Sequence, residues 1–360
     1  MKIIVTGGAG FIGTAVVDFL LTNTAHSVIS IDKLSYASAH NSVCRDDFSH
    51  RYHFYQQDIC ERRSLENIFS EHRPDAVIHL AAESHVDRSI DAPSVFLQSN
   101  IVGTFTLLEV ARKHWQALPE SDRARFRFLH VSTDEVFGDL GAQQGKFDED
   151  SQYQPSSPYA ATKAAADHLV RAWHRTYGLP IVVTNCSNNF GPYQYPEKLI
   201  PLTILRALSG QKIPVYGSGS QIRDWIYVED HARALLAVLE SGIVGETYLV
   251  GAHCEQKNID VVKAICSILD RLRPIDTTDS ANVQRAYAEL IEHVVDRPGH
   301  DVRYAIDASK LMANIGFAPT YTFEQALEKT VSWYLNNHQW SERLLADGNA
   351  LMRAGKKSSL

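Results

Sequence analysis

The segment "PYAATKAAADHLV", residues 158–170, carries a tyrosine and a lysine whose types and spacing suit acid–base chemistry. Tyr159 and Lys163 are four residues apart in a strongly helical pattern, so both are expected on one face of a helix. An ammonium group near a phenol favours the phenolate and lowers a pKa that is normally about 10. Such a phenolate can take the proton of an alcohol while hydride leaves the alcohol carbon. Because an exposed helix can carry the same pair by chance, the pair predicts oxidation only together with a cofactor site.

Two neighbouring acids, Asp134 and Glu135, end the apolar run in "LHVSTDEVFG", residues 129–138. Ser132 and Glu135 match the S-x-x-E capping box, in which a hydroxyl and a carboxylate satisfy backbone amides at a helix start. The helix dipole also stabilises acids there, by about 0.3–1 kcal/mol. Taken alone, this stretch predicts a helix cap, and a catalytic interpretation depends on the rest of the chain.

A glycine-rich turn near the N-terminus predicts the cofactor site. "VTGGAGFIG" places Gly7, Gly10 and Gly13 three residues apart, after a β-branched run and at the start of a helical pattern. Glycines there let backbone amides approach a pyrophosphate at a helix N-terminus. Asp32, at the end of the second predicted strand, can accept hydrogen bonds from a ribose diol and repels a 2′-phosphate. The sequence therefore predicts NAD rather than NADP, although the neighbouring Lys33 works against this preference.

Short apolar segments alternate with helix-like segments through the first half of the chain. Strands are expected at residues 2–6, 27–32, 52–59, 76–82, 127–133 and 180–185. This alternation predicts a parallel sheet with helices on both faces, the α/β doubly wound Rossmann architecture. Residues 225–241 and 245–251 predict one further strand–helix–strand return to the same sheet.

The second half of the chain is richer in loops. After about residue 186, Gly, Pro and Tyr are frequent, which is typical of segments that line a cleft. We expect an NAD-binding domain at 1–188 with a return segment at about 224–252, a smaller C-terminal α/β lobe mainly at 189–340 for the substrate, and a tail at 341–360. Asp58 ends the third predicted strand, where it either binds the adenine amino group or caps a loop.

Composition excludes several classes of function. A formal net charge of -7 over 360 residues argues against a general nucleic-acid binder. No apolar run reaches membrane-spanning length, no signal-peptide pattern opens the chain and no close cluster of metal ligands occurs. The cysteines are odd in number, widely spaced and without C-x-x-C, which predicts reduced thiols in a cytoplasmic protein: Cys44, Cys60, Cys186, Cys254 and Cys266.

Several motifs together carry a family resemblance. T-G-G-x-G-F-I-G, D-x-L-x-Y, H-L-A-A-E-S-H-V-D-R-S, S-T-D-E-V, Y-x-x-x-K and N-C-S-N-N resemble the extended short-chain dehydrogenases/reductases of the NAD-dependent epimerase/dehydratase family. More narrowly, they resemble the dTDP-glucose 4,6-dehydratase family, from residue 2 to about residue 335, including "PEKLIP", "PVYGSGSQIRDWIYVEDHARAL" and "DRPGHDVRYAID". The resemblance implies NAD-dependent C4 oxidation of dTDP-glucose, loss of water across C5 and C6, reduction at C6, and a homodimer.

The resemblance also implies roles for the two acids. Glu135 would be the base for the C5 proton and Asp134 the acid for the C6 oxygen, with Thr133 bonded to the C4 oxygen beside Tyr159. Elimination needs a base and an acid near adjacent carbons. Two neighbouring carboxyls can fill both roles if burial or mutual repulsion keeps one protonated.

Further positions follow from the resemblance. The NAD positions are Gly7, Gly10, Phe11, Ile12, Gly13, Asp32, Lys33, Leu34, Ser35, Asp58, Ile59, Leu80, Ala81, Ala82, Ser84, Ser99, Tyr159, Lys163 and Asn189. The nucleotide-sugar positions are Ser84, Thr133, Asn188, Lys198, Leu199, Pro214, Val215, Tyr216, Arg223, Asn258, Asp296, Arg297, Pro298, Gly299 and His300, of which Lys198, Arg223, Arg297 and His300 are cationic candidates for the diphosphate. Ser99 stands where the family usually has Thr, and Phe137 where Tyr is common.

Three alternatives remain open at this point. A nucleotide-sugar 4-epimerase of the same superfamily uses the Tyr and Lys pair with NAD but has no elimination for Asp134 and Glu135 to catalyse. A dehydratase acting on a CDP-, UDP- or GDP-linked sugar differs only in a few base-recognising loop residues. An NAD-binding regulator without turnover has little need for Tyr159 and Lys163.

Overall fold

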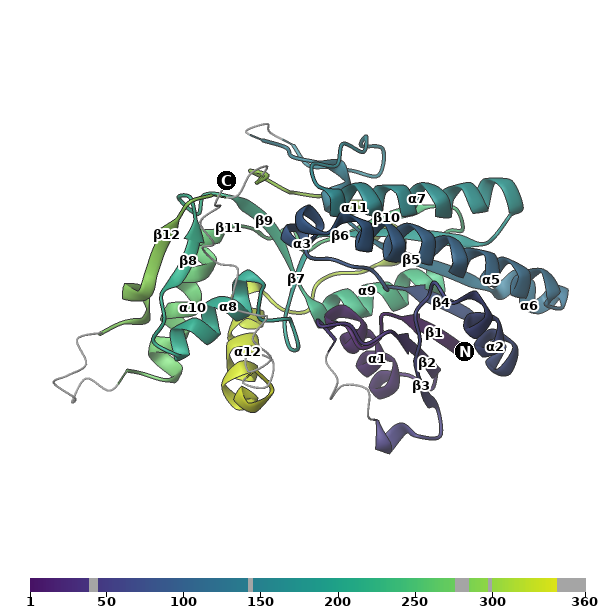
Figure 1. The fold of residues 1–360 in the computed structure, drawn as a ribbon, viewed down its shortest axis with the longest axis horizontal. Helices are drawn as coiled ribbons and strands as arrows, with labels where there is room; N and C mark the ends of the chain where they lie inside the picture. The colour runs from purple at the N-terminus through teal and green to yellow at the C-terminus, as the bar shows by residue number, and fades with distance from the viewer. Residues whose placement is uncertain (39–44, 142–144, 276–284, 297–299, 342–360) are drawn as a thin grey trace.

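A seven-stranded parallel sheet organises the N-terminal two thirds of the chain (Figure 1). The computed structural model describes residues 1–38, 45–141, 145–275, 285–296 and 300–341. The strands lie in the order β10-β6-β5-β4-β1-β2-β3. Their bounds are β1 Lys2–Thr6, β2 Ser27–Asp32, β3 Tyr52–Gln56, β4 Ala76–His79, β5 Arg127–Thr133, β6 Ile181–Cys186 and β10 Thr247–Val250. The predicted doubly wound α/β architecture is confirmed.

Helices cover both faces of this sheet because its strands are apolar on both sides. One core cluster joins the sheet to α1 Phe11–Asn23, α9 Val228–Ser241 and α11 Ser309–Ile315. The other joins it to α2 Arg62–His72, α5 Thr104–Ala117 and α7 Pro158–Tyr177. The shorter helical segments here are η2 Asp46–Phe48, α3 Val86–Asp91, α4 Pro93–Phe96, the π-helical η3 Leu97–Gly103, α6 Glu120–Arg125 and η4 Asp134–Phe137.

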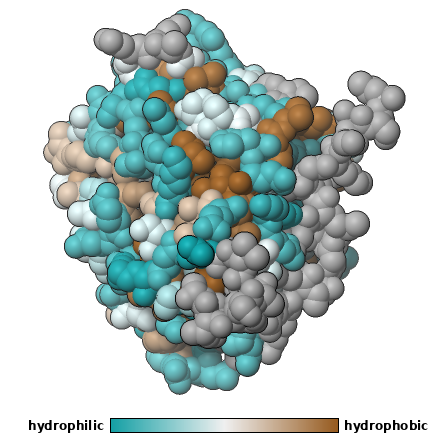
Figure 2. All heavy atoms as spheres, turned by 90° about the vertical axis from the view of Figure 1, so that its left-hand side faces the viewer, coloured by the Kyte–Doolittle hydropathy of each residue, from teal (hydrophilic) through white to brown (hydrophobic). Residues whose placement is uncertain are grey.

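A smaller lobe lies to the left in Figure 1, around its own apolar core. Its sheets are β7 Asn188–Phe190, β9 Ile222–Tyr227 and β11 Glu255–Lys257, and separately β8 Ile213–Tyr216 with β12 Ile291–Val294. Its helices are α8 Leu199–Leu208, α10 Asn258–Leu272, η5 Tyr287–Leu290 and α12 Phe323–Asn336. Figure 2 faces the end of this lobe, where hydrophilic residues surround scattered hydrophobic groups.

The expected strand–helix–strand return to the large sheet is wrong in its first strand. β9 belongs to the three-stranded sheet, where it pairs parallel with β7 and antiparallel with β11. Only Ser187 separates β6 from β7, so the chain leaves the large sheet at once and gives β9 a partner outside it. The helix α9 and strand β10 do return, and β10 pairs with β6. The predicted strands at 52–59 and 76–82 are also shorter, ending at Gln56 and His79.

The glycine turn between β1 and α1 is packed too closely for side chains. Gly7 has φ +74°, and a Cβ there would lie 2.8 Å from the backbone nitrogen of Ala81. A Cβ on Gly13 would lie 1.9 Å from the carbonyl oxygen of Gly7. Such contacts cannot be relieved by a flexible side chain, because the opposing atoms are backbone. The turn therefore needs glycine to bring β1, α1 and the end of β4 together.

We expect Gly13→Ala to weaken NAD binding roughly tenfold or more, about 1.4 kcal/mol, because the added methyl must displace the turn. Titration calorimetry with NAD measures the change. Gly210→Ala is the matched control, since no atom lies within 4 Å of its added Cβ and only the φ of +63° is strained. Wild-type NAD affinity in Gly13→Ala would contradict the requirement for a bare backbone at this position.

Candidate active site

A cavity of about 290 Å³ lies at the carboxyl ends of strands of the large sheet. In open α/β sheets this edge is where ligands bind. The cavity is lined by these predicted positions: Gly7, Gly10, Phe11, Ile12, Gly13, Asp32, Lys33, Ser35, Asp58, Ile59, Leu80, Ala81, Ala82, Ser84, Ser99, Thr133, Asp134, Glu135, Tyr159, Lys163, Asn188, Asn189 and Lys198. The cofactor motif and the residues suited to acid–base chemistry therefore share one cavity.

The dinucleotide end of the cavity combines the glycine turn with a buried carboxylate. Gly10 is the N-cap of α1 and offers no side chain to cap the helix, so the helix N-terminus faces the cavity with backbone alone. Asp32 accepts a hydrogen bond from the Ala9 amide at 3.0 Å through one oxygen, and from the Leu34 amide at 2.8 Å and the Ser38 hydroxyl at 3.2 Å through the other. A pyrophosphate at the helix start and a ribose diol at Asp32 fit these residues.

Lys33 is neutralised by an acid from a neighbouring loop. Its Nζ lies 2.7 Å from Glu83 Oε1 and donates to the Ser99 hydroxyl at 3.0 Å. Burial lowers the pKa of Lys33, but the hydrogen bond and charge of Glu83 outweigh this and leave the pKa raised. Because its charge is already paired, Lys33 offers less attraction to a 2′-phosphate, and the preference set by Asp32 stands.

Helix α7 holds Tyr159 and Lys163 over the end of β5. The helix starts cleanly because the Ser157 hydroxyl accepts a hydrogen bond from the Ala160 amide at 3.1 Å and Pro158 follows the cap. Both functional side chains are buried, and Lys163 Nζ donates to the Val131 carbonyl at 2.9 Å. The helix thus presents the pair to the strand that ends in the two acids.

Without the cofactor, the pKa of Tyr159 is raised despite the neighbouring Lys163. Burial raises the pKa of Tyr159 well above its usual value, the Glu135 charge raises it further, and the hydrogen bond with Thr133 only partly opposes this. Burial also lowers the pKa of Lys163. Desolvation outweighs the attraction between ammonium and phenolate, so Tyr159 needs a further positive charge beside it to act as a base.

Asp134 and Glu135 lie in different environments. Asp134 is 2% exposed, and burial raises its pKa well above the usual range, with the charges of Glu135 and Asp224 adding to the effect. Arg223 and the Thr133 hydroxyl oppose this rise. Glu135 is only half-buried. The pair therefore places a carboxyl whose protonated form is favoured by burial beside a carboxyl that is more open to solvent, an arrangement suited to acid and base roles on adjacent atoms.

The capping-box interpretation of Ser132 is wrong. The N-cap is Thr133, whose hydroxyl accepts from the Glu135 amide at 3.3 Å, and the helical segment is the short 3₁₀ turn η4. Strand β5 continues through Ser132, which keeps that hydroxyl in the buried strand, without a hydrogen-bond partner among the described residues. The cap thus uses Thr133 and leaves both acids at the cavity.

The smaller lobe contributes two cationic side chains, Lys198 and Arg223, to the surroundings of the site. Lys198 lines the cavity and its Nζ donates to the Ser84 carbonyl at 3.3 Å. Arg223 on β9 is buried, donates to the Asp301 carbonyl at 2.9 Å and lies 4.5 Å from the centre of the Tyr304 ring. Arg223 does not line the cavity, but its charge lowers the pKa of Asp134, which does.

A further group of predicted substrate residues lies outside the cavity. His300 and Asp296 approach to 2.6 Å between Nδ1 and Oδ1, and the His300 ring is 6.0 Å from that of Tyr216. Positions that do not line the cavity are Leu34, Leu199, Pro214, Val215, Tyr216, Arg223, Asn258, Asp296 and His300. Arg297, Pro298, Gly299 and Cys44 lie outside the described residues.

Sequence reasoning missed Asp167 and much of the cavity rim. Asp167 is fully buried on α7 and receives hydrogen bonds from Tyr153 at 2.8 Å and Asn185 at 3.1 Å, with His130 Nε2 at 3.0 Å. Its signal was available, since it follows Lys163 by four residues on the same helix face. The missed lining residues are Ile31, Ala37, Ser38, Gln57, Glu83, Val131, Ser132, Cys186, Ser187, Gln194, Tyr195 and Glu197.

Comparison with known proteins decides the family. A family model described as GDP-mannose 4,6 dehydratase matches residues 4–330 of the 360. The chain belongs to that family. Within it, the chain is 57% identical over 354 residues to the dTDP-glucose 4,6-dehydratase of Neisseria meningitidis serogroup B, covering 98% of this chain and 99% of the relative. It is 55% identical over 363 residues to an enzyme of the same name from Escherichia coli, covering 99% of each.

Solved structures of this dehydratase family have the same fold. The dTDP-glucose 4,6-dehydratase of Streptomyces venezuelae, crystallised with NAD, superposes with a TM-score of 0.84 at 40% identity, covering 96% of this chain and all of that one. The UDP-glucose 4-epimerase of Thermotoga maritima superposes with a TM-score of 0.79 at 28% identity, covering 94% of this chain and all of that one. The fold is therefore shared with epimerases, and the site residues have to separate the two reactions.

Proposed function

We propose that this chain converts dTDP-glucose into dTDP-4-keto-6-deoxy-glucose and water with NAD as its cofactor, acting as a hydro-lyase. The observation that carries the proposal is the buried Asp134 beside the more open Glu135, in one cavity with Tyr159. Relatives of this name that are 55–57% identical over nearly the whole chain support the choice of substrate.

The first step is oxidation at C4 of the sugar. The chemistry that bound NAD supplies is a hydride acceptor for C4, a hydride donor for C6 and a positive charge beside Tyr159. Tyr159 takes the proton of the C4 hydroxyl, and Thr133 holds the C4 oxygen. Lys163, one turn along the same helix, keeps a second cation on this side of the cavity. The C4 ketone acidifies the neighbouring C5–H bond.

The second step is elimination across C5 and C6. Glu135 takes the C5 proton, while protonated Asp134 gives its proton to the C6 oxygen, which leaves as water. After hydride reaches C6, the proton held by Glu135 returns to C5. The sugar has then lost one water, and the cofactor ends in the oxidised state in which it began. The proton that Tyr159 took from the C4 hydroxyl equals in number the one that Asp134 gave to the departing oxygen, so returning Tyr159 and Asp134 to their starting forms needs no net proton from solvent.

The alternatives differ in what they ask of these acids. A 4-epimerase uses the Tyr and Lys pair but removes no water. Its reaction therefore has no step that needs a proton from Asp134, whose pKa is raised. The nucleotide base is proposed to contact residues 214–216, and Lys198 and Arg223 to contact the diphosphate. We also propose an NAD-binding domain at residues 1–188, with a return segment at about 224–252, and a nucleotide-sugar-binding lobe mainly at residues 189–340.

We expect purified protein to turn over dTDP-glucose with no net formation of NADH, because hydride leaves C4 and returns to C6. The product is measured by the near-ultraviolet absorbance that 4-keto sugars develop in alkali and by mass loss of one water. UDP-, CDP- and GDP-linked sugars are run in parallel as competing substrates. A clear preference for one of them, or a C4 epimer with unchanged mass, would refute the assignment.

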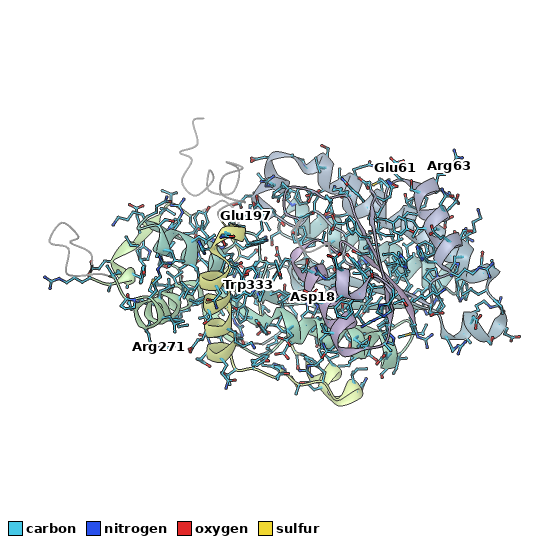
Figure 3. The ribbon with its side chains drawn as sticks, turned by 90° about the horizontal axis from the view of Figure 1, so that it is seen from below. Asp18, Glu61, Arg63, Glu197, Arg271 and Trp333 are labelled. Carbon is cyan, nitrogen blue, oxygen red and sulfur yellow. The ribbon has the colours of Figure 1, made fainter. Side chains whose placement is uncertain are left out.

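Replacing Glu135 with Gln is expected to separate oxidation from elimination. Tyr159 still oxidises C4, but the C5 proton has no base, so elimination falls by roughly 10²–10⁴ and NADH accumulates on the enzyme. Absorbance of bound NADH in a single turnover measures this. Glu61→Gln, a surface acid labelled in Figure 3, is the matched control. Water loss at the wild-type rate in Glu135→Gln would show that another group is the base.

We also propose a homodimer that joins through the continuous helical segment formed by α4, η3 and α5, beside which α7 lies in Figure 1. The helical segment from Pro93 to Ala117 is long and apolar enough to cross a membrane by length and composition alone, yet 56% of its most apolar stretch is buried inside the protein. Its exposed side carries large hydrophobic groups: Val95 (47%), Leu97 (50%), Val102 (41%) and Phe105 (42%). Such a stripe is typical of a subunit interface.

We also propose a cytoplasmic location. It is supported by the four described cysteines, which are free thiols.

Phe105→Lys is expected to convert the dimer to monomer, because it places a charge in an apolar interface. Light scattering after size-exclusion chromatography should change from twice the 40.3 kDa chain mass to the chain mass itself. Val295→Lys is the matched control, since Val295 is 91% exposed on the smaller lobe. A dimeric Phe105→Lys variant, or a monomeric wild type, would refute this interface.

A further inference from the structure

Three segments that are far apart in the sequence meet around the carboxylate of Glu197. Tyr36 lies in the loop after β2, His85 and Arg88 lie at the start of α3, and Glu197 lies just before α8 of the smaller lobe. We call these four residues the Glu197 clasp. Figure 3 shows Glu197 between the two parts of the ribbon. The clasp therefore connects the NAD-binding half with the substrate lobe.

Each clasp residue contacts the central carboxylate. The Tyr36 hydroxyl donates to Glu197 Oε1 at 3.2 Å, His85 Nε2 lies 3.5 Å from Oε2, and Arg88 Nε lies 3.6 Å from Oε2. The Arg88 guanidinium also stacks on the Tyr36 ring, 3.3 Å from its centre. The carboxylate is thus held by one hydroxyl, one imidazole and one cation that support each other.

The clasp is a built interior feature, not a surface ion pair. The side chains of Glu197 and His85 are each 11% exposed. The Arg88 amide donates to His85 Nδ1 at 3.3 Å, so the imidazole proton lies on Nε2 and points at Glu197. A carboxylate placed in such a site is costly unless its partners stay in position, so loss of one partner should loosen the whole contact.

The clasp stands at the rim of the active-site cavity. Glu197 lines the cavity together with its neighbours Tyr195 and Lys198 from the substrate lobe. Tyr195 meets the Tyr36 ring edge-on at 5.3 Å, and Lys198 bonds the Ser84 carbonyl on the opposite rim. Ser35 and Glu83, from the two NAD-side loops, line the same rim. The contacts of Glu197 therefore join the two sides of the cavity at this rim.

We propose that the Glu197 clasp retains the dinucleotide, in its oxidised and its reduced form, through the whole reaction. This inference rests on the proposed function only in that NAD is the cofactor. In that reaction the hydride taken from C4 must return to C6 of the same sugar molecule, so release of NADH between the two steps would strand a keto intermediate. The Glu197 clasp slows dissociation of the cofactor and leaves the chemical groups untouched.

The test is the rate at which the full-length protein releases its cofactor. Glu197→Gln keeps the size of the side chain but removes its charge, and we expect NADH dissociation, followed by loss of its fluorescence on chasing with excess NAD, to become at least tenfold faster. Less NAD should also remain after purification. During turnover of dTDP-glucose, lactate dehydrogenase with pyruvate should capture NADH from the variant and not from the wild type.

Two further variants make the result decisive. Glu328→Gln, which breaks the exposed 2.7 Å ion pair with Arg271 in the smaller lobe, should leave NADH dissociation unchanged. Tyr36→Phe removes one donor and keeps the ring under Arg88, so it should show a smaller increase and serves if Glu197→Gln does not fold. A folded Glu197→Gln variant with the wild-type dissociation rate overturns the proposal. Faster NADH release without any dehydration of dTDP-glucose would support the clasp and refute the proposed function.

Discussion

The buried carboxylate of Asp167 fixes the geometry on which the site depends. It binds His130 on β5, Asn185 on β6 and Tyr153 before α7, so a single group sets the position of α7 against two strands. Although burial alone raises the pKa of Asp167, the hydrogen bond and charge of His130, with the cations nearby, leave it lowered. The same Asn185 amide donates to the Thr133 carbonyl at 3.1 Å. The helix that carries Tyr159 and the strand that ends in the two acids are therefore connected through one buried carboxylate.

Charged residues of the smaller lobe shift the pKa of Asp134 at the end of the large sheet. β9 lies outside the large sheet, where it pairs with β7, and this position brings Arg223 and Asp224 close enough to Asp134 to shift its pKa in opposite directions. Burial is still the largest cause, and it favours the protonated form of Asp134. The smaller lobe thus influences the protonation of Asp134, which belongs to the half of the chain that carries the large sheet. A diphosphate bound near Arg223 would weaken that cation's influence and favour the protonated acid further.

The sequence allowed the local features to be predicted and left the long-range ones hidden. The strands 2–6, 27–32 and 127–133, the glycine turn and the spacing of Tyr159 and Lys163 follow from local pattern, and the structure has them. The sheet that β9 joins depends on pairing with β7, more than thirty residues earlier, which no periodicity encodes. The spacing of Tyr159 and Lys163 shows that a positive charge is near. It does not show the burial that raises the pKa of Tyr159, because desolvation depends on the complete packing. No local pattern singles out Glu197 either, because its partners come from segments far away in the sequence.

The distribution of satisfied and unsatisfied polar groups separates a permanent ligand from a transient one. At the dinucleotide end, Asp32 and Lys33 are already bonded to the protein, so that end is ordered before any ligand arrives. On the side of the cavity that holds the two acids, side-chain oxygens of Asn188 and Asp134 are buried without a partner among the described residues. Each such oxygen costs about 1–3 kcal/mol while it stays unpaired. A sugar nucleotide that supplies those partners recovers this free energy on every binding event and gives it up on release, which suits a substrate that must leave and a cofactor that must stay.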